Sequence, residues 1–221
     1  MTSMTSLSVR AGFAALLLAA PASAQSLLNG SLEGPVAVGS APPDWFEWQK
    51  TPDTCDAAGP FNNTGTPWVL SPDGGTFVRG GGSDFANSEA IGQVVTGFST
   101  GDTYAVNFFQ TNLGFQHPTS GDWLGEDGFW ELVIDGAVVG ASDVLSRPAT
   151  PSDSIVWSVD TLSFTATSAS HEIALVSRST FPGGLAAYMG IDGVRLSLVP
   201  TPGSAALMAL GGVAAIRRRR A

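Results

Sequence analysis

Apolar and polar residues alternate in short runs along most of the chain, and no long stretch has the three-to-four-residue spacing of an amphipathic helix. In residues 102–112, for example, Tyr104, Val106 and Phe108 fall on one face of an extended strand. The dipeptide Asp135-Gly136 between two such runs predicts a tight hairpin turn. The remaining runs lie at residues 90–96, 129–135, 137–139, 154–159, 161–167, 172–178 and 187–199.

Gly, Pro, Asn and Asp punctuate these runs, as is typical of turns between strands. Nothing repeats at a fixed period of about 20 to 50 residues, which argues against a solenoid or a propeller. Eight or more antiparallel strands in one domain of this length predict an all-β fold, a two-sheet antiparallel jelly-roll β-sandwich over residues 25–199. In the run 154–159, the alternation places Ile155, Trp157 and Val159 toward the interior.

Residues 1–24 have the pattern of a secretory signal peptide. Arg10 precedes an apolar run at residues 11–20, and Ala22-Ser23-Ala24 forms a cleavage site before Gln25. The apolar run is too short to span a bilayer. We therefore expect export of the mature protein, the alternative being a buried N-terminal helix.

Residues 200–221 form a second terminal segment. The prolines at 200 and 202 precede an apolar stretch at 204–216 and four arginines at 217–220. As a helix this stretch reaches roughly 20 Å against a hydrocarbon core of about 30 Å, so it is a marginal transmembrane helix. The arginines favour the cytoplasmic side and leave residues 25–199 outside.

This order of parts resembles the PEP-CTERM sorting signal of bacterial surface proteins. The resemblance implies recognition and removal of the tail by a membrane sorting enzyme of the exosortase class. It also implies transient membrane anchoring, followed by release to the cell surface or extracellular matrix. Thr201 departs from the pattern, because the commonest motif has Glu between the prolines. A plain C-terminal membrane anchor remains the alternative.

Charge narrows the choice of partners. Residues 25–199 hold five basic and 19 acidic side chains, a formal net charge of −14. A body this acidic repels phosphate backbones and excludes nucleic acid as a partner, whereas calcium, which takes oxygen ligands, is favoured. Cys55 is the only cysteine, which excludes an internal disulfide, a thiolate zinc site and an iron–sulfur cluster.

The sequence carries little that indicates catalysis. It has no nucleophile elbow, paired-histidine zinc motif or phosphate-binding loop. Both histidines, His117 and His171, are expected at the surface. We predict that the protein is not an enzyme; the carboxylates of Glu126, Asp127 and Glu131 near two tryptophans leave a glycosidase as the less favoured alternative.

Tryptophans are the strongest candidates for ligand contacts. Sugar rings stack their C–H faces on indoles, and nearby amides bind the hydroxyls. Trp157 lies inside an alternating run and is expected in the core. The residues predicted to contact a ligand are the four loop tryptophans Trp45, Trp48, Trp68 and Trp123, with Asn112 among the polar candidates.

Several segments, taken in order, resemble galactose-binding-like jelly rolls, the fold of many carbohydrate-binding modules. Residues 29–33 resemble that family's first strand, residues 42–45 the loop and tryptophan that follow it, and residues 190–196 its closing strand. Residues 91–104 and 157–167 resemble strand pairs from its middle. The resemblance implies a structural calcium held by Glu33 of the opening strand and Asp192 of the closing strand, which would lie side by side.

Together these observations predict a secreted or surface-sorted, non-catalytic carbohydrate-binding protein for extracellular polysaccharide or envelope glycan. A structural extracellular-matrix protein without a defined sugar ligand is the alternative.

Overall fold

The computed structural model describes residues 25, 27–83, 87–181 and 183–200. The predicted signal peptide at 1–24 and the sorting segment beyond residue 200 lie outside the described residues. Within the described part, no helix is long and apolar enough to cross a membrane.

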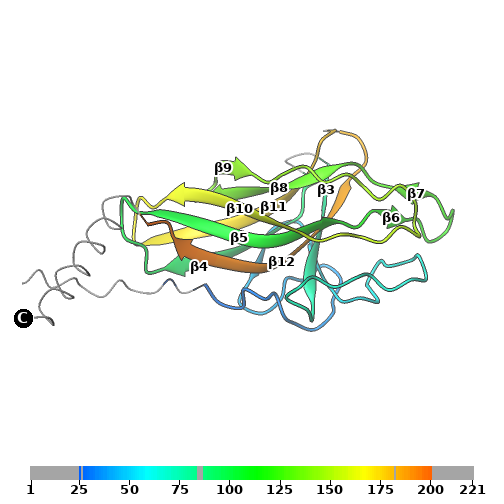
Figure 1. Ribbon diagram of the computed structural model, residues 1–221, viewed down its shortest axis with the longest axis horizontal. Helices are drawn as coiled ribbons and strands as arrows, with labels where there is room; N and C mark the ends of the chain where they lie inside the picture. The colour runs from blue at the N-terminus through cyan, green and yellow to red at the C-terminus, as the bar shows by residue number, and fades with distance from the viewer. Residues whose placement is uncertain (1–24, 26, 84–86, 182, 201–221) are drawn as a thin grey trace, which may run out of the picture.

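Two antiparallel sheets of five strands each pack face to face (Figure 1), which confirms the predicted all-β jelly-roll sandwich. The first sheet has the strand order β1(Phe46–Gln49), β4(Ala90–Thr96), β11(Ser170–Ser179), β8(Gly128–Ile134) and β9(Ala137–Ala141). The second has the order β10(Ser158–Thr165), β5(Thr103–Asn112), β12(Ala187–Leu198), β3(Phe77–Gly82) and β2(Asp53–Cys55). The short pair β6(Phe115–Gln116) and β7(Trp123–Leu124) extends from one end.

The main core lies between the two sheets and follows from the alternation in the sequence. Tyr104, Val106 and Phe108 of β5 all point into it, as predicted. At its centre Trp130 of β8 is fully buried, and its indole N–H donates to the Gly190 carbonyl oxygen at 3.2 Å. The predicted hairpin is also confirmed, because Asp135 and Gly136 connect β8 to β9 with φ of 50° and 81°.

The structure corrects the expectation of two separate strands at residues 154–159 and 161–167. Residues 158–165 form the single strand β10, where the sequence suggested two. Leu162 and Phe164 face the core, so the two-residue period turns Val159 outward, and its side chain is 66% exposed. Trp157 precedes the strand and is partly buried against a second cluster instead of the main core.

This second apolar cluster covers the outer face of the second sheet. Phe77 and Val78 are neighbours on β3 and point to opposite faces, so Val78 joins the main core and Phe77 the second cluster. Loop side chains complete it; its buried members are Cys55, Trp68, Phe77, Leu113 and Ile155. The loops at this end of the sandwich are therefore anchored by their own small core.

His171 is buried, contrary to expectation. Its Nδ1 lies 2.6 Å from Asp135 Oδ2, while Nε2 accepts hydrogen bonds from the backbone N–H groups of Thr167 and Ser168. Both ring nitrogens are therefore engaged, Nε2 with the β10–β11 turn and Nδ1 with the β8–β9 turn.

Candidate functional site

The five residues predicted to contact a ligand lie in three places. Trp45 is in the main core, Trp48 lies on the outer face of the first sheet, and Trp68, Trp123 and Asn112 lie at the loop end of the molecule. Trp45 belongs to the main core, with only 7% of its surface exposed, and its indole N–H donates to the Asn29 carbonyl oxygen at 2.9 Å. Because the Trp45 ring packs inside the main core and lines none of the pockets described below, it has a packing role, which corrects the prediction for Trp45. The bond instead fastens the opening segment to the sandwich.

Trp48 lies apart from the other candidates, on the outer face of the first sheet. Its ring packs over a buried apolar strip and its indole N–H donates to Glu172 Oε1 at 2.6 Å. Gly92 makes room for this ring, since a Cβ there would lie 3.0 Å from the indole. The strip consists of Ala90, Val133, Ala174 and Val176.

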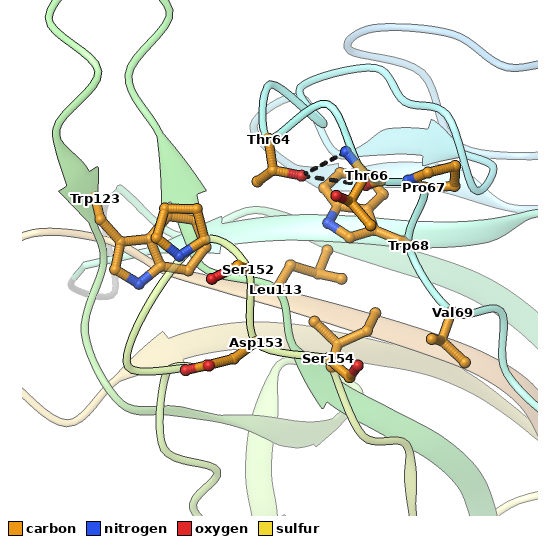
Figure 2. A pocket seen from close by; sticks show the side chains of 12 residues that line it. Thr64, Thr66, Pro67, Trp68, Val69, Leu113, Trp123, Ser152, Asp153 and Ser154 are labelled. Atoms are coloured by element: carbon orange, nitrogen blue, oxygen red, sulfur yellow. Dashed lines mark hydrogen bonds between the residues drawn. The ribbon is translucent and has the colours of Figure 1, made fainter.

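Trp68 and Trp123 come together at the loop end of the molecule, where they flank one surface pocket (Figure 2). Leu113 and Ile155 add apolar lining between them. Hydroxyl and carboxylate groups supply the polar lining, from Thr64, Thr66, Ser152, Asp153 and Ser154. This combination of indole faces and convergent polar groups is typical of small-ligand sites.

Local contacts hold both indoles in place. The indole N–H of Trp123 donates to the Pro148 carbonyl oxygen at 2.7 Å, and the Arg147 guanidinium carbon lies 5.9 Å from the ring centroid. Gly114, with φ of 59°, must be glycine because a Cβ there would lie 2.3 Å from the Trp123 ring. Trp68 meets Phe77 edge to face, with 5.8 Å between ring centroids.

The pocket between the indoles is small, about 90 Å³. A second pocket of about 250 Å³ adjoins it and shares Asp153, Ser154 and Ile155 of the loop between β9 and β10. Asn112 lines this second pocket.

Asn112 itself has no polar group left for a ligand. Its amide donates to the carbonyl oxygens of Glu126 at 2.9 Å and Leu145 at 3.1 Å, and its Oδ1 accepts from the Gly114 N–H at 3.1 Å. Its role is to fasten loops together, which corrects its predicted role. The polar groups that do line the site, on residues 152–154, were missed because a Ser/Asp run after Pro151 indicates only a loop.

Two of the three carboxylates considered for catalysis have structural partners, and the third, Glu126, lines neither pocket at the loop end. Glu131 faces outward from the first sheet and pairs with Arg178 at 2.6 Å. Asp127 accepts the Arg147 backbone N–H at 3.0 Å and a hydroxyl from Ser146. Neither side chain lines the indole pocket.

The opening segment lies beside the last strand, but residues 29–33 form a turn and not the first strand that the resemblance implied. The Val194 N–H donates to the Gly30 carbonyl oxygen at 2.6 Å. Asn29 clamps the turn, donating to the Glu33 and Pro43 carbonyl oxygens at 2.8 and 2.7 Å. The Glu33 carboxylate accepts the Thr76 N–H at 3.1 Å.

Asp192 is buried close to this segment. The Ser71 hydroxyl donates to its Oδ2, and the Gly193 N–H donates to Oδ1 at 2.7 Å. Burial raises the pKa of Asp192 to about 7, with a further contribution from the negative charges of Asp73 and Glu33. Within the described residues, no three His, Cys, Asp or Glu side chains form a ready metal-binding group.

Comparisons with known proteins give a fold and no family. No protein-family model and no curated protein matches the sequence. Among solved structures, a cyclase from Fischerella sp. TAU is similar, with a TM-score of 0.50 and 15% identity over 79% of this chain and 96% of that one. This similarity shows a shared sandwich fold and nothing about activity.

Two more distant structures are sugar-binding proteins. TmCBM61, solved in complex with β-1,4-galactotriose, matches with a TM-score of 0.38 and 17% identity over 73% of this chain and 92% of that one. The sugar-binding EclA C-terminal domain matches with a TM-score of 0.34 and 19% identity over 48% of this chain. The chain spans 64% of the length of the latter.

Proposed function

We propose that this protein is an exported, non-catalytic carbohydrate-binding domain that holds an extracellular glycan at the pocket between Trp68 and Trp123. The observation that carries the proposal is the convergence of two indoles, one from a loop and one from the short strand β7, on one pocket with a hydroxyl-rich lining. A sugar ring would stack its C–H face on Trp123 while the hydroxyls of residues 64, 66, 152 and 154 exchange hydrogen bonds with it.

The position of the pocket supports a display role. Leu113 at the pocket follows the end of β5, whereas Thr103 at the start of β5 accepts the Val199 N–H where the described chain ends. Ten strand residues separate these points, a length of about 30 Å. A domain tethered through its C-terminal segment would therefore present the pocket away from the tether.

A glycan array probed with residues 25–199 tests the proposal. Trp123→Ala should weaken the strongest interaction by about 1 to 3 kcal/mol, or roughly 5- to 150-fold, because a stacked ring is lost. Trp48→Ala is the matched control, since it removes a partly exposed indole from the other sheet. Equal loss in both variants, or no glycan bound by the wild type, would contradict the proposal.

We also propose a structural calcium between the opening segment and the last strand, held by Glu33 and Asp192. Asp73 adds a neighbouring carboxylate, because its Oδ2 is buried without a hydrogen-bond partner and its charge acts on Asp192, while its Oδ1 pairs with Arg195. A hard cation with oxygen ligands would turn the repulsion among these carboxylates into attraction and fasten the two segments together.

Chelation tests the calcium proposal directly. The melting temperature should fall in chelator and recover with excess calcium, following ligand linkage, and Glu33→Gln should abolish the response. A melting temperature that changes with neither chelator nor calcium would refute the calcium site.

Export and C-terminal sorting remain part of the proposal. The mature protein should begin at Gln25 and lack the arginines at 217–220. Intact-mass measurement of protein recovered from native cell surfaces decides this, and retained arginines would favour a plain membrane anchor.

A structural matrix role is the second candidate. It is favoured by the two edge strands β9 and β10, where Val138, Val139 and Val159 are 51%, 43% and 66% exposed. A groove of about 510 Å³ runs between these edges. Exposed edges and apolar side chains promote lateral association. Concentration-dependent oligomers that disappear in Val159→Lys, together with no glycan bound, would favour this role.

A further inference from the structure

The volume of the indole pocket limits what can enter it. At about 90 Å³ it is well below the roughly 300 to 1,000 Å³ of pockets that enclose a whole small ligand. A whole pyranose ring therefore stays at the rim, and a single substituent of that ring enters the pocket. The chemistry of the lining determines which substituent is favoured.

The lining favours a positive charge. Asp153 is the only ionisable side chain among the residues that line the pocket, and it has no ion-pair partner within the described part of the chain. Its Oδ2 accepts the Thr150 N–H at 2.8 Å, which fixes the carboxylate at the pocket. The indole faces of Trp68 and Trp123 attract cations through their ring quadrupoles.

The one cation close to these indoles does not occupy the pocket. Arg147 lies 5.9 Å from the Trp123 ring centroid without lining the pocket, and its guanidinium donates to the Trp123 carbonyl oxygen at 2.8 Å. The Asp127 carboxylate accepts the Arg147 backbone N–H and so fixes the position of this residue outside the pocket. The net charge of −14 over residues 25–199 further favours a cationic ligand over an anionic one.

We infer that the pocket between Trp68, Trp123 and Asp153 receives the ammonium group of an amine-bearing sugar. This inference rests on the proposed glycan-binding function and names its ligand class. A carboxylate substituent would meet Asp153 with like charge. Hydroxymethyl and acetamido groups would fill the space without using that charge.

Binding of three oligosaccharides of equal length tests the inference: chitosan, its fully N-acetylated counterpart, and oligogalacturonate. Tryptophan fluorescence or calorimetry on residues 25–199 reports the affinities. The amine form should bind roughly tenfold more tightly than the acetylated form, and the uronate should not bind. Added salt should weaken the amine form most, because its extra affinity is electrostatic.

Asp153→Asn should remove that roughly tenfold advantage and leave the acetylated form unchanged. Asp44→Asn is the matched control. It makes the same change of charge at an exposed turn residue with φ of 70°, a conformation that asparagine also adopts.

The outcomes separate the two proposals. Equal affinity for the amine and acetylated forms, with Asp153→Asn silent, overturns the ammonium inference and leaves glycan binding intact. If neither Asp153→Asn nor Trp123→Ala weakens binding of the amine form, the ammonium group binds elsewhere, and the ammonium inference is also overturned. Failure of the wild type to bind any of the three, or any array glycan, overturns both.

Discussion

The core between the sheets and the second cluster under the loops use similar side chains in different ways. Trp130 in the main core is fully buried and is held by two sheets whose strands alternate regularly. Trp68 in the second cluster is 8% exposed and has one sheet beneath it and loops above it. The first arrangement gives stability, whereas the second places part of the Trp68 ring in the lining of a surface pocket.

This difference separates the part of the sandwich that gives stability from the part that holds the candidate site. Strands buried on one face need no special residues beyond the two-residue period. Loops need individual fastenings, such as the Asn112 amide and the glycine at 114 beneath Trp123. The candidate site is therefore built on the part of the molecule that depends on single contacts.

The largest expected effect belongs to the main core. Trp130→Ala should lower the free energy of unfolding by about 3 to 5 kcal/mol, because it leaves a cavity between the sheets. Urea denaturation measures the loss, and Trp130→Phe should cost less. A loss below about 1 kcal/mol would show that the centre of the sandwich tolerates a void.

The second cluster should respond less strongly and more locally. Trp68→Ala should cost about 2 to 3 kcal/mol, since loops can collapse partly into the space. Hydrogen exchange should show faster exchange at residues 57–69 with β5 and β11 still protected. Global loss of protection would mean that the loops and the sandwich unfold as one unit.

Acid should stabilise the calcium-free domain. Burial raises the pKa values of Asp192 and Glu89 to about 7, so between about pH 4 and pH 7 the folded state holds more protons than the unfolded state. Stability then falls as the pH rises through this window. In chelator, the melting temperature should increase from pH 8 to pH 5, and Asp192→Asn with Glu89→Gln should flatten the profile.

The smallest effect on stability is expected at the pocket. Trp123→Ala removes a partly exposed ring and one hydrogen bond, so it should cost about 1 kcal/mol or less while glycan affinity falls severalfold. Melting curves and binding curves on the same preparation compare the two. A stability loss as large as that of Trp68→Ala would make Trp123 a packing residue.

Strand positions could be read from the sequence because the signal is local. The run 90–96 coincides with β4, and the turn at Asp135-Gly136 follows from backbone conformation alone. The sequence could not tell which tryptophans pack and which line a pocket, because their hydrogen-bond partners are far away in the sequence. Trp48 donates to Glu172, 124 positions away, and Trp157 to the Val69 carbonyl oxygen, 88 positions away. Asp153 shows the same limit, since only folding brings it beside two indoles.

The central place of β12 in its sheet has a mechanical consequence. The described chain ends just after this strand, which is in register with β5 through eight residue pairs and with β3 through five. A pull on a tethered C-terminus along the strand would have to shear bonds on both sides at once, instead of peeling them one at a time. Such a geometry favours slow forced unfolding of the domain.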